Sequence, residues 1–240
     1  MTQLEKRRLL VIDAARGAAI AGVVLFHFIW DLEFTGIISG VAFHPLWLAF
    51  GRLLAGSFMF LAGLSLVLAH GVQFRTRTYF RRLAIIVGAA LAITIVTLLA
   101  FPSAFVYFGI LHSIAVASLI GVVFLKMPTF ASLLTGLVML ALPWFISLPA
   151  FDPRWMAWIG FSVNPPHSND FVPVFPWAGL TLLGIAFAKT VDFGKTMLAS
   201  AGTDRLFLLW LGWLGRHSLL IYLLHQPIML AIIIPLSRLF

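Results

Sequence analysis

The sequence contains no cysteine, and charged residues make up only 10% of its 240 positions. The absence of cysteine excludes disulfides, thiolate metal sites and a cysteine nucleophile. In a typical soluble domain about a quarter of the residues are charged, so the charged residues here are too few to cover a soluble surface. Hydrophobic residues make up 62% of the chain. This composition predicts an all-α, polytopic membrane protein, because helices satisfy their own backbone hydrogen bonds in lipid.

Seven apolar runs are long enough to be membrane helices. The stretch 206–214 is too short to span a bilayer, and its two tryptophans favour a place in the membrane interface. No internal repeat or low-complexity linker divides the chain, so we expect one membrane domain over residues 1–240. The seven predicted spans cover roughly residues 11–31, 46–69, 83–100, 106–125, 129–149, 173–189 and 217–237.

The basic residues predict the orientation. Of the 16 Lys and Arg residues, most fall in loops that the seven spans place on one side. The positive-inside rule then puts the N-terminus in the cytoplasm and the C-terminus outside, and we expect the inner (plasma) membrane of the cell. The net charge of +8 is therefore a topology signal, and no nucleic-acid partner is expected. The residues on that side are Lys6, Arg7, Arg8, Arg75, Arg77, Arg81, Arg82, Lys126, Lys189, Lys195, Arg205 and Arg216.

The first predicted helix carries ionisable residues that are costly in lipid, by roughly 2.5–3.5 kcal/mol each at the centre. Arg16 and His27 lie eleven residues apart, which is three helical turns, so they share one face. Asp31 follows His27 at the i+4 spacing and is expected to hydrogen-bond the imidazole and set its tautomer. Asp13, three residues before Arg16, is expected to neutralise the guanidinium. This pattern indicates a functional conduit.

Other spans contribute polar groups at matching depth. These are Arg52 in the second span, His112 in the fourth, and Tyr222 and His225 in the last. The outer loop 160–171 adds Asp170. Arg52 has an ordinary alternative as a residue that snorkels to the headgroups. A zinc site from the histidines gains no support from their spacing, so no metal is expected.

Two stretches resemble a known superfamily. RLLVIDAARGAAIAGVVLFHFIWD resembles the first helix of transmembrane acyltransferases, with Asp13, Arg16, Gly17 and His27 in its signature. LGRHSLLIYLLHQPIM resembles the closing motif of the same superfamily, in which Ser218, Tyr222, His225 and Pro227 occupy the pattern.

Two further stretches are similar to the branch related to heparan-α-glucosaminide N-acetyltransferase. They are NDFVPVFPWAGLTLLG, which contains Asp170, Pro173, Pro176, Trp177 and Gly179, and YFRRLAIIVG at the third span. The resemblance implies an enzyme that takes an acyl group, usually acetyl, from cytoplasmic acyl-CoA and gives it to an amino sugar or glycan outside.

The chain also departs from the superfamily. Relatives commonly have ten or eleven helices, so either this smaller core suffices or a second copy of the chain completes the site in a homo-oligomer. The branch places an acetyl-accepting histidine in the first outer loop, where this chain has His44. An acetyl-histidine intermediate therefore stays open.

The residues and the resemblance together predict a division of roles. Arg75, Arg77, Arg81 and Arg82 would attract the phosphates of acetyl-CoA, and Arg16 would bind a phosphate or the pantetheine arm deeper in. His27 is the expected general base or acyl carrier, oriented by Asp31. His112, His225 or Arg52 would stabilise the oxyanion, and Asp170 and Tyr222 would complete the acceptor site.

A transporter or channel is the alternative class of function, because intramembrane Arg and His residues also form substrate or proton paths. Transporters commonly show paired repeats and broken helices at matching positions, and neither is found in this sequence. A non-catalytic scaffold explains the hydrophobicity but not the aligned polar residues.

Overall fold

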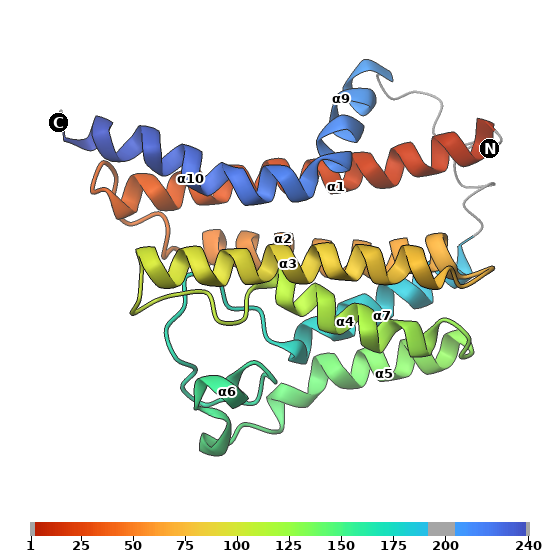
Figure 1. Cartoon of the computed structure of the whole chain (residues 1–240). Coiled ribbons are helices and arrows are strands. Elements are labelled where there is room, and N and C mark those ends of the chain that lie inside the picture. The colour runs from red at the N-terminus through yellow and green to blue at the C-terminus, as the bar shows by residue number, and fades with distance from the viewer. Residues whose placement is uncertain (1–2, 192–204, 239–240) are drawn as a thin grey trace. The chain divides into compact units, whose positions relative to one another are not determined.

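The structure is a computed structural model that describes residues 3–191 and 205–238. Side chains are described within these ranges except those of residues 3–9 and Arg205. The basic residue Lys195 and the side chains of Lys6, Arg7 and Arg8 therefore lie outside the described residues. Within the described ranges the elements are all helical (Figure 1), which confirms the all-α prediction.

Among the described residues, four helices are long and apolar enough to cross a membrane. They are α1 (Gln3–Phe34), α2 (Pro45–His70), α3 (Thr76–Ala100) and α10 (Ser218–Ser237). α3 begins seven residues before the predicted span because its first two turns are polar and arginine-rich, which favours a helix but not burial in lipid. The protein is therefore built around membrane-type helices.

Three of the seven predicted spans form shorter helices. These are α4 (Ile110–Phe124), α5 (Thr129–Ala141) and α7 (Val174–Thr190), with 15, 13 and 17 residues. At about 1.5 Å per residue they are roughly 20–26 Å long, which is less than the roughly 30 Å thickness of a hydrocarbon core. Seven spans, and the orientation derived from them, stay predictions.

The predicted span 129–149 is too long. α5 ends at Ala141 and continues only as the 3₁₀ turn η1 (Leu142–Trp144), which contains Pro143. Proline lacks the N–H that the α-helix would need at this point and clashes with the preceding turn. The short elements η2 (Pro149–Phe151) and α6 (Arg154–Ala157) follow.

The loop after α5 is organised by one carboxylate. Asp152 accepts hydrogen bonds from the Ser162 hydroxyl at 2.7 Å, the Val163 N–H at 2.8 Å and the Asn164 N–H at 2.9 Å. These bonds, with that from the Asn164 backbone as the largest cause, lower the pKa of Asp152 from its ordinary value. The ionised carboxylate thus ties residues 162–164 to the end of η2.

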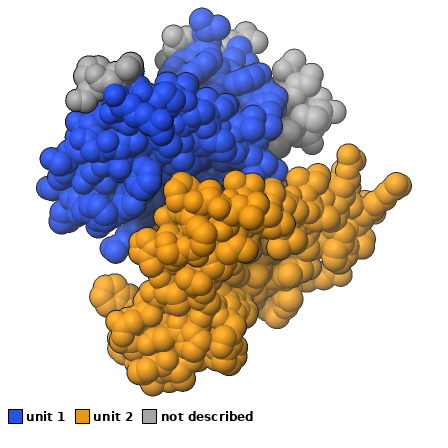
Figure 2. Space-filling view, turned by 60° about the vertical axis from the view of Figure 1, so that its left-hand side comes forward, with its two compact units in different colours: residues 1–58, 192–240 blue, residues 59–191 orange. Residues whose placement is uncertain are grey.

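The described structure divides into two compact units, which are coloured separately in Figure 2. Unit 1 comprises residues 1–58 and 192–240, and unit 2 comprises residues 59–191. The boundary between the two units falls inside α2.

Unit 1 is built on α1, against which α9 (Arg205–Arg216) and α10 pack. Glycines permit the close approach of α1 and α9. A Cβ at Gly17 would overlap the carbonyl oxygen of Leu211, and a Cβ at Gly215 would overlap that of Asp13. Small residues at such crossings let helix backbones touch. The stretch predicted to lie in the interface is thus a helix that packs directly on α1.

In unit 2, α7 packs against α5 and the second half of α2. Gly179 lies against Leu140 of α5, and a Cβ at Gly184 would overlap the carbonyl oxygen of Phe60 in α2. The Thr181 hydroxyl, which is buried, donates a hydrogen bond to the carbonyl of Met59 at 3.0 Å. α7 is thereby fixed between two neighbours, and the loop before it is positioned next to the start of α4.

Candidate active site

His27 lies on α1, and its ring is held by its own helix. Nδ1 is 2.9 Å from the carbonyl oxygen of Val23. Because a carbonyl oxygen only accepts hydrogen bonds, Nδ1 carries the proton and Nε2 keeps a lone pair. The imidazole is therefore held in the tautomer that a general base acting through Nε2 requires.

His225 of α10 lies beside His27 within unit 1. The two ring centroids are 4.8 Å apart and the ring planes meet at 70°. Nδ1 of His225 donates to the carbonyl oxygen of Tyr222 at 2.7 Å, and the Tyr222 ring lies 5.6 Å from the imidazole. His225 Nε2 is buried and has no hydrogen-bond partner among the described residues. The structure thus brings together three residues that the sequence marked, from helices nearly 200 positions apart.

Asp31 has a different partner from the one that the sequence suggested. Its side chain is 1% exposed, and its Oδ1 accepts a hydrogen bond from Nε2 of Gln226 at 2.6 Å. The Nδ1 of His27 is bonded to Val23 instead. Helical side chains point toward the N-terminus of their helix, which brings the His27 ring to the carbonyl four residues earlier and away from Asp31.

Gln226 is the residue of this cluster that sequence reasoning missed. It follows His225 directly, within the stretch YLLHQP. A glutamine in an apolar helix is itself a polar group that needs a partner, and this was the available signal. Its partner could not be read from the sequence, because Asp31 lies 195 positions away.

Arg16 lies on α1, the same continuous helix as His27, and pairs with Asp13. The distance from the guanidinium to Asp13 Oδ1 is 3.1 Å, so the predicted i,i+3 ion pair is confirmed. Arg216 of α9 approaches the other oxygen of Asp13 at 4.0 Å. Asp13 therefore lies between two arginines at the crossing of α1 and α9.

In unit 2, both ring nitrogens of His112 are bonded. Nδ1 accepts from the Gly109 N–H at 3.2 Å, and Nε2 is 3.3 Å from the Thr94 hydroxyl oxygen. Because the Thr94 hydroxyl donates to the carbonyl of Val106 at 2.7 Å, its oxygen accepts the Nε2 proton of His112. The imidazole connects α3 to the start of α4.

Asp170 completes this helix start. Its Oδ2 accepts a hydrogen bond from the Ile110 N–H, at the first turn of α4, at 2.9 Å. A carboxylate at this position binds an otherwise unpaired N–H and complements the helix dipole. The geometry of Asp170 and His112 is that of a helix-capping pair, and their predicted part in acceptor binding or catalysis stays a prediction.

The remaining basic candidates are exposed. Arg52 is exposed on α2. Arg75 precedes α3 and Arg77, Arg81 and Arg82 lie in its first two turns, all with exposed side chains. The first turn of α3 contains no acidic residue. Positive charge is unfavourable at the positive end of a helix, so this arginine cluster would bind an anion favourably.

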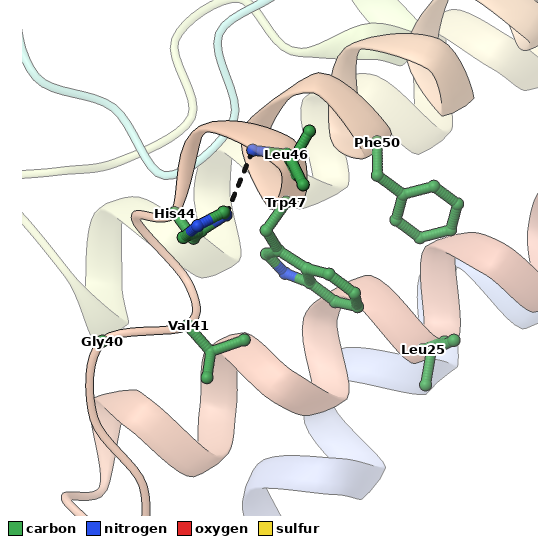
Figure 3. A pocket seen from close by; sticks show the side chains of 7 residues that line it. All are labelled: Leu25, Gly40, Val41, His44, Leu46, Trp47 and Phe50. Carbon is green, nitrogen blue, oxygen red and sulfur yellow. Dashed lines mark hydrogen bonds between the residues drawn. The ribbon is translucent and has the colours of Figure 1, made fainter.

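A cavity of about 460 Å³ lies in unit 1 at the start of α2 (Figure 3). His44 lines it and accepts the N–H of Leu46 through Nδ1 at 3.3 Å. Figure 3 shows Trp47 and Phe50 pointing toward Leu25 of α1. The walls of the cavity are almost wholly apolar. The lining residues are Leu25, Gly40, Val41, His44, Leu46, Trp47 and Phe50.

Residues 8–227 of the 240-residue chain match the model of a protein family that is described as "Heparan-alpha-glucosaminide N-acetyltransferase, catalytic". The chain belongs to this family. No curated protein and no solved structure gives a match. The match covers both units and every candidate residue named above. It establishes this protein as a member of an N-acetyltransferase family.

The motifs of this family member separate into two kinds in the structure. Gly17, Gly179 and Asp170 serve packing and helix capping. His27 and His225, in contrast, each bond a backbone carbonyl through Nδ1, and their ring centroids lie 4.8 Å apart. The first-helix and last-helix motifs therefore supply the candidate chemistry.

Proposed function

We propose that this protein is a membrane-embedded acyltransferase that moves an acetyl group from cytoplasmic acetyl-CoA to an extracytoplasmic amino sugar or glycan. The family match supports acetyl transfer. One observation carries the assignment of the base: His27 is held by Val23 with its Nε2 lone pair available, and a second imidazole lies 4.8 Å away.

Acetyl transfer needs a group that accepts a proton. As the acceptor nitrogen or oxygen attacks the thioester carbonyl, its proton passes to His27 Nε2. The carbon–sulfur bond breaks, and the CoA thiolate takes a proton from the imidazolium. Imidazole suits this cycle because its unperturbed pKa lies near neutral pH. The carbonyl of Val23 keeps accepting the Nδ1 proton and so stabilises the charged ring. An acetylated His27 is the covalent variant of this step.

Acetyl-CoA carries several phosphate charges, which the arginine cluster of α3 would neutralise. Arg75, Arg77, Arg81 and Arg82 are exposed and lie within eight residues of one another. Guanidinium groups bind phosphate through paired hydrogen bonds. We assign the CoA phosphates to this cluster. Arg16, already paired with Asp13, is assigned to the pantetheine arm or a phosphate.

The test is acetyl transfer by the purified protein in detergent, with labelled acetyl-CoA and a panel of amino sugars. His27→Ala should lower kcat by about 10²–10⁴-fold, the usual contribution of a general base. Its matched control is His217→Ala, because His217 bonds the carbonyl of Trp213 four residues earlier at 2.9 Å, as His27 bonds that of Val23. The control should keep the wild-type rate.

Two results would overturn this proposal. Equal turnover by the His27→Ala and wild-type proteins would remove His27 from the chemistry. Saturable uptake of substrate into liposomes, without any acetylated product, would favour the transporter. Binding of acetyl-CoA is measured in the same preparations, so that loss of the donor site is distinguished from loss of the base.

A further inference from the structure

Four buried polar atoms in unit 1 have no hydrogen-bond partner among the described residues. One of them, Nε1 of Trp47, lies on α2. The other three lie on α1 and α10, and they are Oδ2 of Asp31, Oε1 of Gln226 and Nε2 of His225. Asp31 is 1% exposed and His225 is 9% exposed. Asp31 and Gln226 are bonded to each other, and His225 adjoins Gln226 in α10. Such a concentration of unpaired buried groups is unusual, because a buried polar group without a partner loses the hydrogen bonds that it makes to water in the unfolded chain.

All three atoms are acceptors. Gln226 donates through Nε2 to the carboxylate, so its amide oxygen is the atom left over. The Nδ1 proton of His225 goes to the Tyr222 carbonyl, so its Nε2 offers a lone pair. The second carboxylate oxygen of Asp31 can also only accept while it is ionised. The cluster therefore lacks donors, not acceptors.

This imbalance selects among the chemical groups of an acetyl-transfer reaction. A thioester carbonyl and a phosphate offer acceptors and would add to the excess. A hydroxyl offers one donor, and an ammonium group offers three donors together with a positive charge that suits Asp31. The group that satisfies the cluster is thus the amino group of an acceptor in its protonated form.

We infer that Asp31, Gln226 and His225 form the binding site for the nucleophilic amino group of the acceptor, and that Gln226 is a positioning residue. Gln226 holds Oδ1 of Asp31 at 2.6 Å, which fixes the carboxylate so that Oδ2 is free to bind the ligand. This inference rests on the proposed function, because it places the acceptor beside His27 through the contact of His27 with His225.

The bound ammonium first loses one proton, which leaves to water through His27, so that His27 is neutral again. The neutral amine then attacks the thioester carbonyl carbon, and its second proton passes to Nε2 of His27. The new carbon–nitrogen bond forms as the carbon–sulfur bond breaks, and the thiolate of CoA takes the proton from the imidazolium. The amide, free CoA and one proton released to water are the products.

The experiment compares glucosamine with glucose, its hydroxyl counterpart, as acceptors for the wild-type protein and the Asp31→Asn variant. The substitution keeps the shape of the side chain and removes its charge. We expect the KM for glucosamine to rise at least tenfold while the Kd for acetyl-CoA stays within twofold. An unchanged KM for glucosamine would overturn the inference.

Gln226→Met is the second variant, and it tests the site if the Asp31→Asn protein does not fold. It leaves the carboxylate of Asp31 unchanged. It removes the bond to Oδ1 at similar side-chain length. The KM for glucosamine should rise with acetyl-CoA binding unchanged, whereas equal losses of donor and acceptor affinity would indicate a merely structural role and refute the assignment.

The wild-type protein separates the two proposals. Acetyl transfer to glucose in preference to glucosamine would overturn the amine site but leave the proposed acetyltransferase standing. The absence of transfer to every acceptor would overturn the proposed function itself, and the amine site with it.

Discussion

The glycine at the crossing of α1 and α9 offers a sharp test of the packing in unit 1. Gly17→Ala adds a Cβ that would overlap the carbonyl oxygen of Leu211. Overpacking of this kind costs about 1–3 kcal/mol, and here the obstacle is backbone, which cannot rotate away. Alanine in place of glycine also gains about 1 kcal/mol of helix propensity. The matched control is Gly88→Ala in α3, which has no heavy atom within 4 Å of the added Cβ and makes the same propensity gain.

The difference between the two variants therefore isolates the overlap, at about 1–3 kcal/mol. A protein of this size loses roughly 2–4 °C of thermal midpoint per kcal/mol, so Gly17→Ala should melt roughly 2–12 °C below Gly88→Ala. The assay is thermal unfolding of both proteins in the same detergent. Equal midpoints would refute the close contact of α1 with α9. Equal midpoints would also mean that close packing does not explain Gly17 in the first-helix motif, and Gly17 would become a candidate functional residue.

Two further predictions concern unit 2. Asp170→Ala removes the carboxylate that caps α4 at Ile110. The variant should therefore lose about 1–2 kcal/mol of unfolding free energy, with the KM for the acceptor unchanged. A higher KM at wild-type stability would instead show that Asp170 binds the acceptor. Hydrogen bonds lower the pKa of Asp152, so their stabilisation is present above the ordinary value of 3.8 and is lost as the pH falls through the folded-state value. Amide exchange at Val163 and Asn164, corrected for its intrinsic rate, should accelerate on acidification in the wild-type protein and show no such step in Asp152→Asn.

Features of local origin were predicted well. Long apolar runs identified the positions of α1, α2, α3 and α10, because hydropathy over 20 residues depends on the chain alone. The ion pair of Asp13 with Arg16 followed from the i,i+3 spacing on a helix. α5 ends earlier than its apolar run predicts, because Pro143 lacks the N–H that the α-helix would need.

The candidate site was predicted only in part. His27 and His225 were both identified from polar residues in apolar helices, and their contact appears only when α10 packs against α1. The local i+4 rule proposed Asp31 as the partner of His27, but the helix carbonyl of Val23 takes that place. The i+4 rule identifies side chains that are close enough to interact. Their rotamers and the neighbouring helices determine which of these side chains form a contact.

The sequence by itself determined that the chain is helical, belongs in a membrane and carries costly polar groups on its first and last long helices. Only the tertiary structure decided the partners of those groups. It joined Asp31 to Gln226 and gave His112 and Asp170 the geometry of a helix cap. The physical reason is the distance along the chain over which each interaction acts. Hydrophobicity and helical spacing act over a few turns, but a hydrogen bond across 195 positions exists only after the helices have packed.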